Sequence, residues 1–554
     1  MRRKYLYIFL LIGLVLLVGV KHRNLFTSET VEPGSEAGDY GGDWFSIISR
    51  EVNTKKIRLL VDEKEIAMQQ NPVVMSETGD FMIPVSALTD AFSCVAHLYD
   101  HTNLVIEKNM VRVEISPTVV DGALYIPVTV IEENLLYQVD WNGKERILEM
   151  HSGDAGEKIL PAAYDYRNEG RAPKVKNQGV LGTCWSFASL MALESRLLPE
   201  ESFDFSEDHM SRQNSFHMSQ NDGGEYTMSM AYLLAWQGPI LESDDVYGDN
   251  YSPRGLPPVK HVQSIQVLPE KDYESIKESV YFYGGVQSSL YTSMVTAETD
   301  SEYYNKEKNA YYYTGTTKPN HDVVIVGWDD NYAKENFNQK PEGDGAFICA
   351  NSWGGEFGEE GYFYVSYYDT NIGIHNILYR RVDSPDNYDK IYQSDLCGWV
   401  GQLGYGKENA YFANVYEADA DEELMAAGFY AIGEDTSYEI YTVTNVEGSN
   451  SFSGRVLAAS GMLKHSGYYT IDFAQPVKLN QGERFAVIVN ITTPGSVHPV
   501  AIEYNAPDKT TKVDLNDGEG YISFRGSSWE RVEDMQNCNI CLKAYTREVG
   551  KDGE

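Results

Sequence analysis

The sequence predicts a multidomain protein with a repeated β-rich stalk module, a central α+β domain and a C-terminal all-β sandwich. A chain of 554 residues with 42% hydrophobic composition is too long to fold around one core. Residues 160–382 alternate helix-like and strand-like patterns, whereas residues 383–547 contain regular short strands separated by Gly, Asn and Asp turns. Within residues 56–151 a strand-rich pattern occurs twice. We therefore expect three folded domains of different class.

The net charge argues against one class of partner. The chain has 45 Lys and Arg against 82 Asp and Glu, a formal charge of −37 at pH 7, which repels nucleic acid. The acidic residues are scattered among 40 Tyr and 8 Trp and form no long runs, as on the solvated surface of folded domains. We expect no nucleic-acid partner.

The first residues have the pattern of an export signal. Basic residues at positions 2–4 precede an apolar run over residues 5–20, and no A-x-A cleavage site follows. We expect residues 1–24 to be an uncleaved anchor, or a signal peptide if they are removed, with a linker at residues 25–55. Positive residues before the run would place everything after it on the extracellular face of the cell membrane, or in the medium if the signal is cleaved.

The predicted stalk module contains a repeated motif. Residues 81–88 read FMIPVSAL and residues 124–131 read LYIPVTVI, and a helix-like stretch and two more strands follow each copy. The pattern resembles the copper amine oxidase N-terminal-like domain of bacterial surface proteins. The segment has no His cluster that could bind copper, so we expect no metal there.

Six cysteines are few for an exported chain of this length. Cys538 and Cys541 form a lone C-x-x-C, but zinc usually requires four clustered ligands. We therefore expect no metal site. A structural disulfide and a pair of buried thiols both remain open for these two residues.

Cys184 lies in the most informative segment of the chain. Apolar residues from Phe187 to Leu198 have helical spacing, so a helix is predicted to begin at Cys184. The partial positive charge at a helix N-terminus lowers the pKa of a thiol, and the thiolate is the nucleophilic form. An isolated cysteine would more often be a small buried thiol.

Two later segments favour the reactive interpretation. His321 precedes an apolar strand, and Asn351 lies in a Gly-rich turn. Each alone would more often be a structural residue. Together, Cys184, His321 and Asn351 indicate nucleophilic catalysis.

Residues 160–382 resemble the papain-like cysteine peptidases. The motif around the nucleophile is Leu181-Gly182-Thr183-Cys184-Trp185, and residues 205–207 (FSE) and 221–224 (NDGG) match further family motifs. The resemblance implies a papain-type α+β fold. The two cysteines that form a disulfide in the family are Leu181 and Asn221 here. Both partners are replaced, so the disulfide is missing and no unpaired thiol is left behind.

The resemblance also implies roles for individual residues. Cys184 would attack the scissile carbonyl, His321 would transfer the proton, and Asn351 would orient the imidazole. Gln178 would donate to the oxyanion together with the Cys184 backbone N–H. For substrate binding, Gly223 and Gly224 would offer backbone to an extended peptide, and Trp353 would cover the His321 to Asn351 hydrogen bond.

Residues 383–547 resemble the lectin-like domain that follows such peptidase domains in Gram-positive surface proteins. Trp399, Tyr405 and Tyr411 could stack on sugars, although aromatic residues in a β-sandwich more often belong to the core. The acidic run at residues 417–423 could bind calcium, although a solvated loop is the simpler interpretation.

These observations predict an extracellular cysteine endopeptidase that acts on protein or peptide substrates through a thioacyl-enzyme, without a cofactor. The C-terminal domain would bind a carbohydrate or cell-surface ligand, and the N-terminal segment would bind the membrane. One alternative is a surface adhesin with an idle peptidase-like scaffold. Another is transpeptidation, which shares the acyl-enzyme and differs only in its acceptor.

Overall fold

The structure is a computed structural model that describes residues 56–550 except 67, 69–70, 77–79, 93, 100–102, 109–110, 121, 136, 153–159, 507–512 and 517. The predicted anchor and linker lie outside the described residues. Among the helices that are described, none is long and apolar enough to cross a membrane.

The N-terminal module consists of short strands and two helices. Its elements are β1 (Arg58–Val61), β2 (Lys64–Ile66), β3 (Val74–Met75), β4 (Phe81–Pro84), α2 (Ser86–Phe92), β5 (Val95–Tyr99), β6 (Asn103–Lys108), β7 (Val111–Ile115), β8 (Thr118–Val120), β9 (Ala123–Pro127), α3 (Val128–Leu135), β10 (Tyr137–Asn142) and β11 (Ile147–Ser152). Each copy of the sequence repeat forms a strand followed by a helix, and the two strands, β4 and β9, pair antiparallel with Ile83 opposite Ile126. The predicted strand-rich repeat is therefore found.

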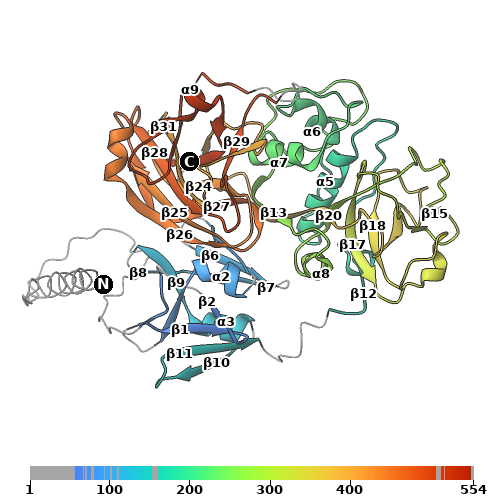
Figure 1. The fold of residues 1–554 in the computed structure, drawn as a ribbon, viewed down its shortest axis with the longest axis horizontal. Coiled ribbons are helices and arrows are strands. Elements are labelled where there is room, and N and C mark those ends of the chain that lie inside the picture. The colour runs from blue at the N-terminus through green and yellow to red at the C-terminus, as the bar shows by residue number, and fades with distance from the viewer. Residues whose placement is uncertain are drawn as a thin grey trace, which may run out of the picture. The chain divides into compact units, whose positions relative to one another are not determined.

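Residues 160–383, which contain the predicted peptidase domain and are called the peptidase half below, combine helices with a long sheet. The elements are β12 (Ala163–Asp165), α4 (Tyr166–Glu169), α5 (Cys184–Leu197), α6 (Glu207–Gln213), α7 (Tyr226–Leu234), β13 (His261–Leu268), α8 (Tyr273–Phe282), β14 (Val286–Leu290), β15 (Tyr304–Asn305), β16 (Ala310–Tyr311), β17 (His321–Asp329), η1 (Lys334–Asn336), β18 (Ala346–Ala350), β19 (Tyr362–Ser366) and β20 (Ile374–Asp383). Helix α5 packs against α6 and α7 and against strands β14, β17 and β20 (Figure 1). The predicted α+β arrangement is confirmed.

In residues 390–548, the β-rich half, nearly all the regular elements are strands. They comprise β21 (Lys390–Tyr392), β22 (Gly401–Leu403), β23 (Asn409–Glu417), β24 (Glu422–Ala431), β25 (Thr436–Val443), η2 (Ser449–Gly454), β26 (Val456–Leu463), β27 (Ser466–Leu479), β28 (Arg484–Thr492), β29 (Val500–Glu503), β30 (Gly520–Ser523), β31 (Glu530–Arg531), α9 (Val532–Gln536), β32 (Asn539–Ile540) and β33 (Leu542–Glu548). Apolar side chains of β23, β25 and β28 share one buried cluster with those of β24, β27 and β33. The predicted β-sandwich is confirmed.

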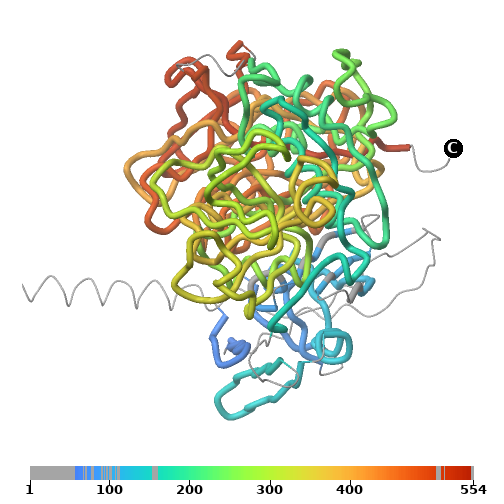
Figure 2. The backbone as a smooth tube through the Cα atoms, turned by 90° about the vertical axis from the view of Figure 1, so that its right-hand side faces the viewer, coloured from blue at the N-terminus to red at the C-terminus, as the bar shows by residue number. Residues whose placement is uncertain are grey.

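One sheet runs through both halves. Its order is β15-β16-β19-β18-β17-β14-β20-β13-β27-β24-β33-β21, with β12 beside β17. The halves join where β13 pairs antiparallel with β27, with Ile265 opposite Tyr468 (Figure 1). Figure 2 shows the backbone of both halves as a tube, with the peptidase half in green and yellow and the β-rich half in orange and red. The sequence suggested two separate domains, but their main chains are hydrogen-bonded to each other.

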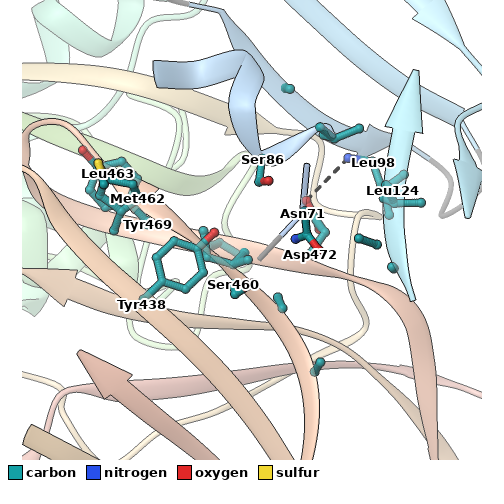
Figure 3. Close-up of a pocket in the computed structure, with 18 of the residues that line it drawn as sticks. Asn71, Ser86, Leu98, Leu124, Tyr438, Ser460, Met462, Leu463, Tyr469 and Asp472 are labelled. Carbon is teal, nitrogen blue, oxygen red and sulfur yellow. Dashed lines mark hydrogen bonds between the residues drawn. The ribbon is translucent and has the colours of Figure 1, made fainter. Parts of the chain in front are cut away.

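A cavity of about 220 Å³ is lined by residues of the N-terminal module and of both later halves. Figure 3 shows Leu98 near Asp472, and the Leu98 backbone N–H donates to the Asp472 carboxylate at 3.4 Å. Cys184, His321, Asn351 and Gln178 do not line this cavity. The candidate chemistry therefore lies elsewhere.

Candidate active site

Cys184 begins the central helix of the peptidase half. It is the first residue of α5, and almost all the residues that follow it in the helix are buried. Of the six cysteines, all within the described part of the chain, five are buried and Cys184 is half-buried. Cys184 is therefore the cysteine best placed to meet a substrate.

His321 and Asn351 are brought together by two paired strands. His321 is the first residue of β17, Asn351 follows β18, and the strands pair antiparallel with Val324 opposite Ala350. His321 Nε2 lies 2.8 Å from Asn351 Oδ1, which also accepts the Ser352 backbone N–H at 2.8 Å. An atom that accepts a backbone N–H is the amide oxygen, so the ring proton of His321 is on Nε2. The other ring nitrogen, Nδ1, is then the basic one.

Trp353 covers this hydrogen bond. Its ring stacks on the His321 ring with centroids 4.8 Å apart and an interplanar angle of 26°. Only 4% of Trp353 is exposed, so it offers little surface to a ligand and mainly excludes water from the imidazole.

Gln178 is held by the same turn that contains Asn351. The Gln178 backbone N–H donates to the Ser352 carbonyl at 2.8 Å, and the Ser352 hydroxyl donates to Gln178 Oε1 at 2.6 Å. Gln178 Nε2 donates one hydrogen to the Leu181 carbonyl at 2.7 Å. The amide is therefore fixed in orientation, and its second N–H remains for another acceptor.

Of the two predicted substrate glycines, Gly224 has a close neighbour and Gly223 has a positive φ. A Cβ on Gly224 would lie 2.4 Å from Trp185 Nε1, so the loop at Gly224 must pass directly over the residue after Cys184. Gly223 has a φ of 84°, a conformation that favours glycine. The structure thus places this loop beside the start of α5.

Backbone contacts hold the loop where the family disulfide would lie. Gly182 donates its N–H to the Gln220 carbonyl at 2.8 Å, and a Cβ on Gly182 would lie 2.9 Å from the Gly223 nitrogen. Positions 181 and 221 each lie next to this contact in the chain. Close backbone packing joins the two loops at the point where the disulfide is missing.

Burial governs the charge states of the reactive groups. It raises the pKa of the Cys184 thiol to about 12, and the Asp322 carboxylate adds to the rise, whereas the backbone N–H groups of Asp322 and Trp185 oppose it. Burial lowers the pKa of His321 to about 4, although the hydrogen bond to Asn351 opposes this shift. Burial thus opposes the lowering of the thiol pKa that a helix N-terminus predicts.

A buried ion cluster supports the segment that precedes the nucleophile. Lys176 Nζ lies 3.1 Å from Glu194 of α5 and 2.9 Å from Glu207 of α6. Burial raises the pKa of Glu194 to about 7 and that of Glu207 to about 8, while Lys176 opposes both shifts. The cluster connects the Gln178 segment to the helix that Cys184 begins.

The candidates in the β-rich half are part of the fold. Trp399, Tyr405 and Tyr411 are half-buried and pack against hydrophobic clusters. Their aromatic neighbours are Tyr430, Phe524 and Trp529, respectively. The core interpretation of these aromatic residues is therefore supported.

The acidic run and the C-x-x-C pair are also accounted for by internal contacts. Glu422 is buried and accepts the Tyr392 hydroxyl at 2.9 Å. Among the described residues, no three His, Cys, Asp or Glu side chains are grouped so as to hold a metal ion. Cys538 and Cys541 are free, buried thiols, so of the two alternatives for this pair the structure has the thiols.

Two residues at the site were missed from the sequence. Ser352 orients Gln178, and its position directly after Asn351 could have suggested this. Asp322 follows His321, and a carboxylate at the start of an otherwise apolar buried strand is unusual enough to have been noticed.

Two family models match the chain. Residues 160–380 match the papain family cysteine protease, and residues 391–546 match the lectin like domain. Among curated proteins, cathepsin K of Gallus gallus is 27% identical over 281 residues, which are 48% of this chain and 69% of that protein. Cysteine proteinase 1 of Entamoeba histolytica is 26% identical over 288 residues, 50% of this chain and 83% of that protein.

Two solved structures of the clostridial cysteine protease Cwp84 are similar over most of the chain. One, after propeptide cleavage, is 28% identical with a TM-score of 0.63, and the match covers 70% of this chain and 99% of that chain. The other contains the cysteine protease and lectin-like domains of Cwp84, a surface layer associated protein of Clostridium difficile. It is 28% identical with a TM-score of 0.62, over 71% of this chain and 90% of that chain.

Proposed function

Because residues 160–380 belong to the papain family of cysteine proteases, this chain is a cysteine peptidase, and we propose that it cleaves peptide bonds with Cys184 as nucleophile. The observation that supports this most strongly is the 2.8 Å hydrogen bond between His321 Nε2 and Asn351 Oδ1. It leaves Nδ1 as the basic nitrogen on β17, the strand against which α5 packs. The Cys184 sulfur lies beside the backbone N–H of Asp322, the residue after His321.

In the proposed reaction His321 first takes the thiol proton on Nδ1. The sulfur of Cys184 then bonds to the scissile carbonyl carbon, and the protonated imidazole gives its proton to the departing amine. Water next attacks the thioester, gives a proton to His321, and releases the acid and the thiol. Because burial disfavours the charged form of each group alone, their mutual attraction must stabilise the ion pair when it forms.

We assign the oxyanion donors to the Gln178 side chain and the Cys184 backbone N–H. Ser352 Oγ and the Leu181 carbonyl fix the Gln178 amide, so little reorganisation is needed when negative charge develops on the substrate oxygen. Asn351 orients the imidazole, and Trp353 keeps water from their hydrogen bond. Gly223 and Gly224 would pair with the backbone of an extended substrate.

We also propose that the peptidase works outside the cell. The basic residues at positions 2–4 and the apolar run at 5–20 support export with an uncleaved anchor, and the similar Cwp84 is a surface layer associated protein. The lectin-like domain would bind a carbohydrate or other cell-surface ligand. The proposed parts are a stalk module at 56–151, a peptidase domain at 160–382 and a lectin-like domain at 383–547.

Labelling with a thiol-directed epoxide tests the nucleophile. We expect the full chain, under reducing conditions, to incorporate one equivalent and to lose peptide cleavage in parallel. Cys184→Ala should incorporate none, while Cys94→Ala, a buried cysteine of the N-terminal module, should behave like the parent. If the parent is neither labelled nor active, the proposal fails and the result favours the adhesin interpretation. If an added amine captures most of the acyl group, the reaction is transpeptidation.

A further inference from the structure

Asp322 places a buried carboxylate next to the proposed nucleophile. It is 9% exposed and lies at the start of β17, directly after His321. Its backbone N–H is beside the Cys184 sulfur. A peptide held for attack by that sulfur must therefore lie close to Asp322. The mechanism proposed above gives the carboxylate no role.

The carboxylate is held by neutral donors. Ser289 Oγ donates to Asp322 Oδ1 at 2.7 Å, and Gln287 Nε2 donates to Oδ2 at 3.0 Å. Gln287 Oε1 accepts the hydroxyl of Ser189, a residue of α5, at 2.8 Å, and the Ser189 hydroxyl lies 2.6 Å from that of Ser229 in α7. This chain of buried hydrogen bonds fixes the carboxylate in place without neutralising it.

Little positive charge surrounds Asp322, and part of it comes from His375, which lowers the pKa of the carboxyl when its ring is protonated. Among the described ion pairs, no Lys or Arg lies within 4.0 Å of its carboxylate. His375 Nδ1 lies 3.3 Å from Ser289 Oγ, and its ring packs against Tyr226 with centroids 5.2 Å apart. Glu225, an exposed residue, adds a second negative charge that acts on Asp322. A buried carboxylate with neutral donors and an acidic neighbour favours a cation.

The substrate is the natural source of that cation. Glu225 and Tyr226 directly follow Gly223 and Gly224, the glycines proposed to pair with the substrate backbone. A peptide on those glycines would place a side chain between the start of α7 and the start of β17. Tyr226 would supply an aromatic wall for the methylene groups of a long side chain.

We propose that Asp322, assisted by Glu225, makes this peptidase select substrates with a Lys or Arg side chain close to the scissile bond. The inference rests on the proposed function, because it needs a peptide at Cys184. A charge-assisted hydrogen bond to a buried carboxylate should raise kcat/KM for the basic substrate about 10-fold to 100-fold over an uncharged side chain of the same size.

The first test uses the full-length parent enzyme, so it needs no variant to fold. Two fluorogenic peptide series differ at one position near the cleaved bond, which carries lysine or its uncharged analogue norleucine. We expect kcat/KM to be about 10-fold to 100-fold higher for lysine at one such position. Equal values at every position scanned would overturn the inference.

The second test uses Asp322→Asn. The Asn oxygen can accept from Gln287 and its nitrogen can donate to the Ser289 hydroxyl, so the buried hydrogen bonds survive. The lysine preference, measured as the ratio of kcat/KM for the lysine peptide to kcat/KM for the norleucine peptide, should fall to within about twofold of unity. Asp329→Asn, at the far end of β17, is the matched control and should keep the preference. A preserved preference in Asp322→Asn would contradict the proposal.

Epoxide titration distinguishes a failure of this inference from a failure of the proposed function. An enzyme that is labelled at Cys184 and cleaves peptides without preferring lysine defeats only this inference. A parent that is not labelled defeats the proposed function, and the inference falls with it.

Discussion

Two lysines with largely buried side chains, one in each half of the chain after residue 160, use similar ion pairs in different ways. Lys176 lies between Glu194 and Glu207 in the peptidase half, and Lys543 lies 2.8 Å from Asp395 in the β-rich half. Lys176 is two residues before Gln178, and Glu194 is on the helix that Cys184 begins. The Lys543 pair only ties β33 to the segment after β21. A buried ion pair thus indicates a role in catalysis only where its residues are close in the chain to the reactive groups.

Replacing each lysine should give the largest effects and sharpen this comparison. Lys176→Met and Lys543→Met should each lower the free energy of unfolding by about 3–5 kcal/mol, because carboxylates are left buried without a partner. Specific activity per folded molecule should fall only for Lys176→Met. Chemical denaturation combined with active-site titration measures both quantities. Equal loss of specific activity in the two variants would contradict the proposed difference between the two lysines.

The loss in Lys176→Met should also depend on pH. Burial raises the pKa of Glu194 and Glu207 to about 7 and about 8, so the folded state holds protons that the unfolded state has released. Stability of the variant should therefore fall as pH rises from 6 to 9. The exposed Lys174 pairs with Asp204, and Lys174→Met is the control that should show little change.

The oxyanion donor should give the next largest effect. Gln178→Ala should lower kcat about 100-fold to 1000-fold with a nearly unchanged midpoint of denaturation. Gln393→Ala removes a similar amide that accepts from Lys543 in the β-rich half. Steady-state kinetics should show no comparable loss there. A small effect of Gln178→Ala would remove Gln178 from the mechanism.

Ser352 should have a smaller effect, because it acts only through Gln178. Ser352→Ala removes one hydrogen bond of about 0.5–1.5 kcal/mol, which corresponds to a loss of about 2-fold to 10-fold in kcat. In a double-mutant cycle, the Ser352 effect should vanish when Gln178 is already Ala. Additive effects would instead indicate an independent structural role.

Asp322→Asn should cause the smallest change, in the reactivity of the thiol. The Asp322 carboxylate adds to the raised pKa of Cys184, so its removal should move alkylation of Cys184 toward lower pH. Glu225, His375 and His321 also face this region and remain unchanged. The pH profile of iodoacetamide reaction measures the shift, with Asp329→Asn as control. A shift toward higher pH would contradict the electrostatic account.

Local sequence patterns predicted much of the candidate site. Apolar spacing placed the start of a helix at Cys184, an apolar run placed a strand after His321, and glycines placed a turn at Asn351. Each of these signals is contained in a segment of about ten consecutive residues. The paired strands then bring His321 and Asn351 into contact.

The remaining features depend on contacts between distant residues. The pairing of β13 with β27 joins residues about 200 positions apart, and neither strand's pattern encodes its partner. The raised pKa of Cys184 depends on burial by several elements, which opposes the local helix effect. The surroundings of Asp322 come from β14, β17 and the start of α7 together, so the sequence alone did not single it out.

The pairing of β13 with β27 also limits how proteolysis can separate the peptidase half from the β-rich half. A protease that cut the connecting segment at residues 384–389 would leave the main-chain hydrogen bonds between the halves in place. The peptidase half would therefore stay bound to the β-rich half after such a cut, and separating the two would also require these strands to part.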